Sequence, residues 1–110
     1  MKRAGNLDGA LNFYKNAMDL EPDNSVFLYN TGVLYNIRSD YGDAIEVLEK
    51  SIINNRENVY AYLALGDALE KKNEHQKALY VYRDLMSIGV NVQGLQKKLE
   101  SLEELIELEN

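Results

Sequence analysis

The stretch that decides the fold is SVFLYNTGVLYNIRSDYGDAIEVLEKSIINNREN, which spans residues 25–58. Ala44, near its middle, has counterparts at equal distances before and after it in the sequence, at Ala10 and Ala78. Each of these alanines is followed directly by an aliphatic residue and, four positions later, by a large apolar one. Such a 34-residue period is the sequence signature of a protein built from stacked structural repeats.

The pattern inside each repeat is helical. Residues 25–38 carry apolar side chains on all sides, which is typical of a helix buried by several neighbours. Residues 41–54 combine an apolar stripe with a charged face, which is typical of a helix with one side in water. Gly32 and Gly66 are separated by the same period as the alanines. Each unit is therefore predicted to be a helical hairpin, with these small residues at the close contact between its helices.

Polar residues and glycine mark the expected helix ends. Asn24, Asp40 and Asn73 precede helical segments, and their side-chain oxygens can accept hydrogen bonds from the free N–H groups of a first turn. Gly89 is expected to end a helix in the left-handed conformation, and Asn91 to start the last helix.

The chain resembles the tetratricopeptide repeat family, whose pattern is W-x2-L-G-x2-Y, then A-x3-F, then P. The residues that carry the resemblance are Leu28, Thr31, Gly32 and Tyr35 in one unit, Tyr62, Leu65, Gly66 and Leu69 in the next, and second halves that begin at Ala10, Ala44 and Ala78. Arg56 and Val90 replace the proline of the pattern, but its small close-packing residues are kept. The resemblance implies an all-α fold, a right-handed α-solenoid of helix-turn-helix hairpins.

The repeat register divides the single domain, residues 1–110, into four parts. They are a half repeat with only its second helix at 1–24, full repeats at 25–58 and 59–90, and a C-terminal capping helix at 91–110. The segment before Ala10 is too short for a first helix of the first unit. Because a solenoid needs a polar cap at each end, we expect a longer array or a helix from another chain. A short protein with a degenerate first repeat is the alternative.

The C-terminal segment carries a regular apolar stripe. Its members, which alternate between spacings of three and four, are Val92, Leu95, Leu99, Leu102 and Ile106. We expect this stripe to pack on the last repeat, because a terminal helix shields the end of a solenoid. The alternative is that the distal half of the helix docks with another chain.

Composition excludes several kinds of site. The 110 residues include no cysteine and one histidine, so disulfides, Cys-based metal sites and sites with two imidazoles are excluded. No residue constellation for catalysis, a metal or a cofactor is apparent, so we predict a non-catalytic protein. Eighteen acidic against twelve basic residues, a net charge of −6, argue against nucleic acid as a partner. No stretch is long and apolar enough for a membrane span or a signal peptide, which favours a cytoplasmic location.

The family resemblance also implies a binding surface, because the first helix of each unit lines a concave groove in this family. The residues expected to face the groove are Val26, Tyr29, Asn30, Val33, Asn36 and Ile37 in one unit, and Tyr60, Leu63, Ala64, Asp67, Glu70 and Lys71 in the next. Asp67 and Glu70 against Lys71 give this surface a charge of −1. We therefore expect a neutral or basic peptide or helix as the partner.

Three functions follow as hypotheses. The first is a protein–protein interaction scaffold that binds a partner in the groove. The second is a structural or oligomerisation module that self-associates through the C-terminal helix and an open N-terminal edge formed by Leu7, Leu11 and Tyr14. The third is an accessory fragment of a larger repeat protein.

A chaperone adaptor of the carboxylate-clamp type is disfavoured. Asn30 matches the clamp asparagine of such adaptors, but Tyr60 and Ala64 stand where the resemblance implies Lys and Arg.

Overall fold

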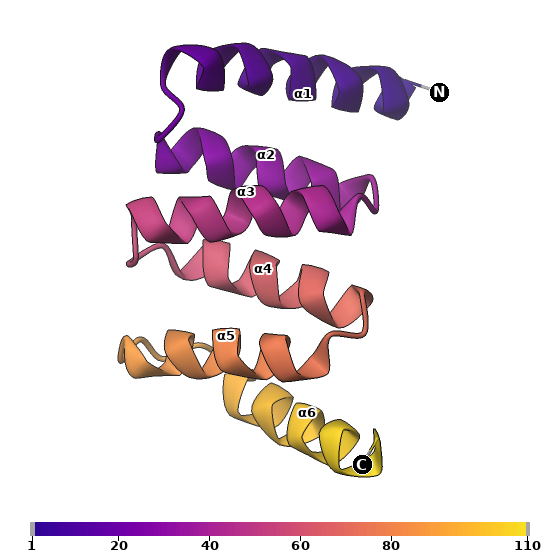
Figure 1. The fold of residues 1–110 in the computed structure, drawn as a ribbon, viewed down its shortest axis with the longest axis vertical. Coiled ribbons are helices and arrows are strands. Elements are labelled where there is room, and N and C mark those ends of the chain that lie inside the picture. The colour runs from indigo at the N-terminus through magenta and orange to yellow at the C-terminus, as the bar shows by residue number, and fades with distance from the viewer. Residues whose placement is uncertain (1, 110) are drawn as a thin grey trace.

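The computed structural model describes residues 2–109, and within that range the chain forms six helices and no strand. The helices are α1 (Lys2–Leu20), α2 (Ser25–Ile37), α3 (Tyr41–Asn54), α4 (Val59–Lys71), α5 (His75–Ser87) and α6 (Leu95–Glu109). They stack one on the next in chain order, with the two termini at opposite ends of the stack (Figure 1). This arrangement confirms the predicted all-α solenoid fold.

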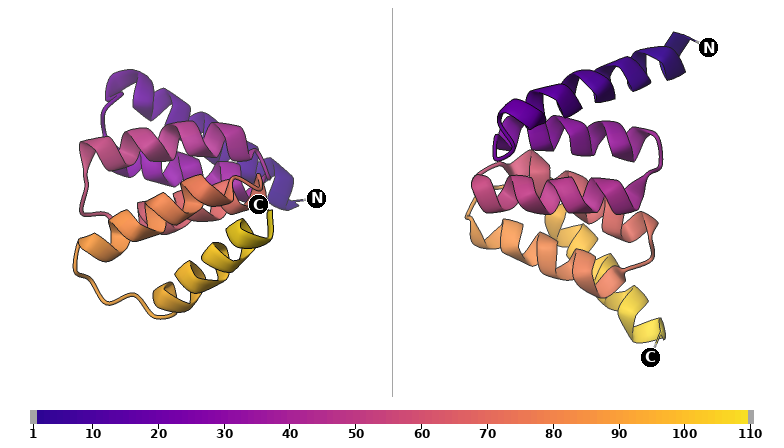
Figure 2. Two further views of the ribbon diagram at one scale, coloured as in Figure 1. Left: turned by 60° about the horizontal axis from the view of Figure 1, so that its bottom comes forward. Right: turned by 45° about the horizontal axis from the view of Figure 1, so that its top comes forward.

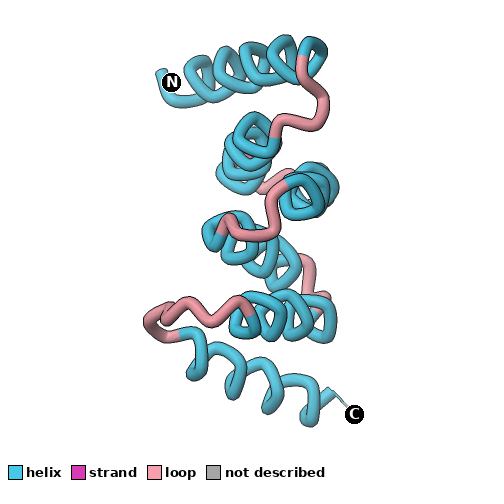
Figure 3. The backbone as a smooth tube through the Cα atoms, turned by 90° about the vertical axis from the view of Figure 1, so that its left-hand side faces the viewer, coloured by secondary structure: helices cyan, strands magenta, loops and turns pink. Residues whose placement is uncertain are grey.

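The hairpins place alternate helices on two sides of the stack. Figure 3 shows α2 and α4 along one side, and α3 and α5 along the other. Helix α6 packs on α5 and is joined to α4 by a side-chain ion pair, in which the Nζ atom of Lys98 is 3.1 Å from Oε2 of Glu70. We call the side with α2, α4 and α6 the inner face, and the side with α3 and α5 the outer face. Helices α1 and α6 close the two ends (Figure 2).

Glycine lets the two helices of each hairpin approach closely, as the repeat pattern predicts. A Cβ atom built on Gly32 would overlap the side chain of Leu48, and one on Gly66 would overlap the ring of Tyr82. Ala44 and Ala78 are completely buried. The small residues that recur once per repeat in the sequence therefore lie where the helices of each hairpin meet.

The turns inside the two hairpins also obey the repeat. Ser39 and Asn73, at equivalent positions of successive repeats, both take the left-handed conformation, with φ values of 65° and 60°. In the second turn the N–H of Glu74 donates to the carbonyl of Leu69 at 2.9 Å, a bond that closes the end of α4. The expectation that Asn73 caps α5 is wrong, because Glu74 occupies the cap position.

The predicted N-caps have different outcomes. The side chain of Asn24 accepts hydrogen bonds from the N–H groups of Val26 and Phe27, which confirms it as the cap of α2. Asp40 occupies the cap position of α3, but its side chain makes no capping hydrogen bond. Asn58 caps α4 and lies one full repeat after Asn24, so the repeat extends to the cap itself.

The last helix begins later than predicted. Gly89 takes a left-handed φ of 87°, as expected, but Gly94 does so as well, with φ of 81°. The second left-handed residue delays the helix start from Asn91 to Leu95. Val92 of the predicted stripe therefore precedes α6.

Polar contacts hold α6 against the last hairpin along its whole length. They join Lys98 to Glu70 at 3.1 Å, Arg83 to Glu103 at 2.9 Å, and His75 to Glu109 at 3.0 Å. The three leucines at the centre of the predicted stripe, Leu95, Leu99 and Leu102, are buried beneath them. An apolar seam and a polar border together attach α6 to the stack.

Candidate interaction surfaces

The predicted groove residues lie on α2 and α4 and differ in exposure. Val26, Ile37 and Tyr60 are apolar yet 57%, 65% and 68% exposed. Those that are half-buried are Tyr29, Asn30, Val33, Asn36, Leu63, Ala64 and Glu70. Asp67 and Lys71 form an exposed ion pair one helical turn apart, at 3.6 Å. The exposed apolar side chains make this face a candidate for partner binding.

The two predicted groove asparagines already bridge neighbouring helices. Asn30 Nδ2 donates to the hydroxyl of Tyr14 on α1 at 3.2 Å. Asn36 Nδ2 donates to the carbonyl of Ala64 on α4 at 3.1 Å, and its buried Oδ1 atom accepts no hydrogen bond from any described residue. Asn36 therefore serves the packing of α2 on α4, and Asn30 is the better placed of the two for a ligand.

Two cavities hollow the inner face. One, of about 350 Å³, lies between α1 and α2 and is lined by Ala10, Tyr14, Tyr29, Asn30, Val33 and Leu34. The other, of about 300 Å³, lies between α4 and α6 and is lined by Glu70, Gly94, Lys97, Lys98, Ser101, Leu102 and Leu105. The inner face thus extends beyond the two helices expected from the sequence and includes α6.

Helix α6 changes the charge of the inner face. Lys97 and Lys98 lie one repeat period after Leu63 and Ala64, so the repeat register could have assigned them to this surface. The same register adds Glu104, one repeat period after Glu70, so these three residues change the expected charge from −1 to 0. A preference for basic partners therefore no longer follows from the charge of the inner face.

A buried tyrosine holds one of the residues that line the cavity between α4 and α6. The Tyr82 hydroxyl donates to Oε2 of Glu70 at 2.7 Å, and Lys98 approaches the same oxygen at 3.1 Å. Burial, followed by the hydrogen bond to Glu70, raises the pKa of Tyr82 well above its usual value. The phenol therefore remains a proton donor and fixes the carboxylate between α4, α5 and α6.

The N-terminal edge differs from the expected one. Leu11 is only 2% exposed, and Leu7 and Tyr14 are half-buried, so these three residues form no uncovered patch. Within residues 2–109, α1 contacts α2 and no other helix, so this is the face that packs on α2. The opposite side of α1 exposes Phe13, at 64%, and Leu20, at 85%.

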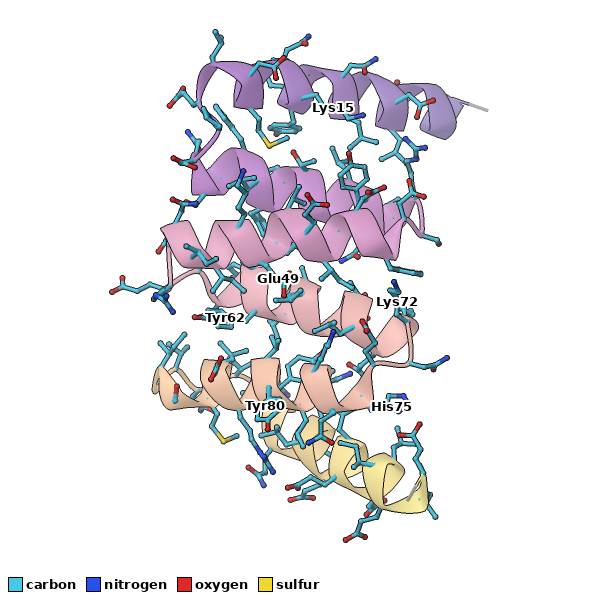
Figure 4. All side chains as sticks on the ribbon, viewed as in Figure 1. Lys15, Glu49, Tyr62, Lys72, His75 and Tyr80 are labelled. Carbon is cyan, nitrogen blue, oxygen red and sulfur yellow. The ribbon has the colours of Figure 1, made fainter. Side chains whose placement is uncertain are left out.

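A third cavity opens on the outer face, where no binding residues were expected. It measures about 240 Å³, lies between α3 and α5, and is lined by Glu49, Ile52, Ile53, Tyr62, Leu65, Val81 and Asp84. Figure 4 shows Glu49 and Tyr62 in the band between these helices. Burial and the negative charge of Asp84 raise the pKa of Tyr62, against the opposing effect of Arg56.

The described part of the chain contains neither a metal-binding cluster nor a membrane-spanning helix. No group of three or more His, Asp or Glu side chains is placed to hold a metal ion there. None of the six helices combines the length and apolarity that crossing a bilayer requires.

Known proteins share this architecture. The chain is 32% identical over 79 residues to BBSome complex member BBS4 of Bos taurus, a match that covers 72% of this chain and 15% of that protein. A crystal structure of MamA superposes with a TM-score of 0.86 at 25% identity, covering 96% of this chain and 62% of MamA. The first repeat domain of Spaghetti (RPAP3), bound to the HSP90 peptide SRMEEVD, has a TM-score of 0.82 at 21% identity, covering 96% and 85%.

Two family models match directly. Both are described as tetratricopeptide repeat, and they match residues 13–46 and 38–86. Together the matches include the second part of α1, all of α2, α3 and α4, and α5 up to Met86. These matches agree with the helical hairpins, the glycine contacts and the repeat period of the chain. The chain belongs to the tetratricopeptide repeat family.

Proposed function

We propose that this chain is a non-catalytic protein-interaction scaffold that binds a peptide or helix of a partner on its inner face. The observation that carries the proposal is the exposure of Val26 and Tyr60, which occupy the same position in successive repeats. Each leaves more than half of an apolar side chain in water, one repeat apart along the inner face. Apolar anchors at a regular spacing suit a segment that runs along the stack.

The domain division supports the same proposal. A half repeat, two full repeats and a terminal helix give an inner face that runs from the α1–α2 cavity to the α4–α6 cavity. The first repeat domain of RPAP3, which has a similar fold, binds a peptide of HSP90. Because the chain covers 15% of BBS4, the complex membership of that relative supports only the general role of a scaffold.

We expect Tyr60→Ala to weaken partner binding by about 1 kcal/mol or more, roughly fivefold in Kd, because it removes an exposed aromatic anchor. Asn30→Ala should have a similar effect through the lost amide. The measurement is a pull-down from lysate, with the recovered partner titrated against each variant by calorimetry. Glu46→Ala, on α3 and outside the inner face, is the control.

Asn30 needs a control of its own, because Asn30→Ala also removes the hydrogen bond to Tyr14. Tyr14→Phe removes the same bond and leaves the amide in place. If Tyr14→Phe and Asn30→Ala weaken binding equally, the amide acts by holding α1 and not by touching the partner. Loss of binding by the Glu46 variant together with retention by Tyr60→Ala would exclude the inner face.

The open side of α1 favours a second candidate, association through the N-terminal end. Ala10 and Tyr14 line the α1–α2 cavity, and their counterparts in the next repeat, Ala44 and Leu48, are fully buried in the first hairpin. In that hairpin Leu48 lies against Gly32 of α2. A further helix seated on the open side of α1 would cover Phe13 and complete the burial of Ala10.

We expect the purified chain to self-associate in a concentration-dependent manner, and Phe13→Lys to abolish this. The reason is that Phe13 is 64% exposed in the one-chain structure. Multi-angle light scattering over a wide concentration range measures the mass. A monomer at every concentration would contradict self-association and leave the inner-face proposal unaffected.

A further inference from the structure

The outer groove, defined by the seven residues that line the cavity between α3 and α5, combines an apolar floor with two charged walls. Ile52, Leu65 and Val81 supply apolar lining from three different helices. Glu49 stands on α3 and Asp84 on α5, so a carboxylate flanks the cavity from each side. Ligand sites commonly combine an apolar hollow with a few polar groups in this way.

Neither carboxylate is used for internal ion pairing. The ion pairs formed among the described residues involve other acidic side chains and leave Glu49 and Asp84 without a basic partner. Asp84 lies close enough to Tyr62 to act on its pKa. The groove therefore holds two negative charges beside apolar surface. Neither carboxylate forms an ion pair with a basic side chain of the described residues.

The repeat itself does not require these charges. Glu49 lies one repeat period after Lys15, and Asp84 lies one repeat period after Lys50. The same two positions are thus basic one repeat earlier and acidic around the outer groove. Since the fold accepts lysine at both positions, the carboxylates are free to serve a partner.

We propose that the outer groove binds a basic peptide segment, which inserts one aliphatic side chain between α3 and α5 and presents Lys or Arg side chains to Glu49 and Asp84. Ile53, 66% exposed at the edge of the groove, enlarges the apolar contact. The paired carboxylates repel phosphate groups, which disfavours nucleic acid and anionic lipid as occupants. This site lies on the face opposite the inner face and is independent of the proposed function.

Three labelled peptides test the chemistry of the groove. They are SGKKLKKGS, SGKKAKKGS, which lacks the aliphatic side chain, and SGEELEEGS, which reverses the charge. We expect the first to bind the full chain about fivefold or more tightly than the second, and the third not to bind, in fluorescence anisotropy titrations. Methyl signals of Ile52, Leu65 and Val81 should shift most in NMR spectra with the first peptide and should not shift with the third.

Charge-reversed variants locate the binding. Glu49→Lys with Asp84→Lys gives the outer groove the charges found one repeat earlier, and should abolish binding of SGKKLKKGS. The matched control, Asp23→Lys with Glu104→Lys, changes the net charge equally at exposed positions away from the groove and should retain binding. Thermal unfolding of both double variants verifies that each is folded before it is titrated.

Three results would overturn the proposal. Equal affinity for SGKKLKKGS and SGKKAKKGS would indicate general attraction to an acidic protein. Equal losses of SGKKLKKGS affinity in the two double variants would also indicate general attraction to an acidic protein. Failure of SGKKLKKGS to bind would remove the basic segment as the occupant. Tyr60→Ala, which tests the inner face, should leave all three titrations unchanged, so failure of either site is recognisable separately.

Discussion

Tyr82→Ala should lower the free energy of unfolding by about 3–5 kcal/mol, the largest effect we expect of any single substitution. Tyr82 is 2% exposed, and its ring lies against Gly66 at the contact between α4 and α5. Removing the ring leaves a cavity there and also deprives Glu70 of one of its two hydrogen-bond donors. Chemical denaturation followed by circular dichroism measures the loss.

Tyr82→Phe separates packing from hydrogen bonding in this prediction. It keeps the ring and removes only the hydroxyl, so it should cost about 0.5–1.5 kcal/mol. Glu70 would still be held by Lys98. If Tyr82→Phe destabilises as much as Tyr82→Ala, then the link from α5 through Glu70 to α6, and not the close contact of the hairpin, dominates at this position.

Much of the fold could be predicted because residues at equivalent positions of successive repeats make equivalent helix contacts. Gly32 and Gly66 marked the hairpin contacts, and Asn24 marked a helix start, because each property depends on nearby sequence. The start of α6 could not be predicted in the same way. It depends on the left-handed conformation of Gly94, and glycine permits this conformation without requiring it.

The face of α1 was harder to predict than its existence. Leu11 and Phe13 are both apolar, and periodicity alone does not reveal which of them meets α2. In the structure Leu11 is buried and Phe13 is exposed, because α2 is the helix that α1 packs on. The interpretation of Leu11 as part of an open edge was wrong for this reason.

The candidate surfaces needed contacts that join distant residues. Lys97 and Lys98 reach the inner face only because α6 packs on α5 and continues the stack, although the repeat register pointed to their positions. The outer groove joins Glu49 to Asp84 across two hairpins. Whether such a junction is filled or hollow depends on side-chain sizes from three helices, which spacing along the chain does not encode.

Gly66→Ala should lower the free energy of unfolding by about 1–3 kcal/mol, although alanine favours helices more than glycine does. The added Cβ would overlap the ring of Tyr82, which is buried and held at its hydroxyl by Glu70, so the ring has little room to move. Thermal and chemical unfolding of the variant measure the loss, which should appear as a lower Tm and a lower denaturation midpoint.

Gly9→Ala is the matched control, since it makes the same chemical change inside another helix. Apart from the adjacent backbone of α1 itself, a Cβ atom on Gly9 would meet no described atom within 4 Å, so only the helix preference of alanine remains. This variant should gain about 0.5–1 kcal/mol. The same substitution is thus expected to have opposite signs at two glycines of one chain. A gain at Gly66 as well would mean that the helices of the second hairpin can separate at little cost, and that the repeated glycine is not needed for their contact.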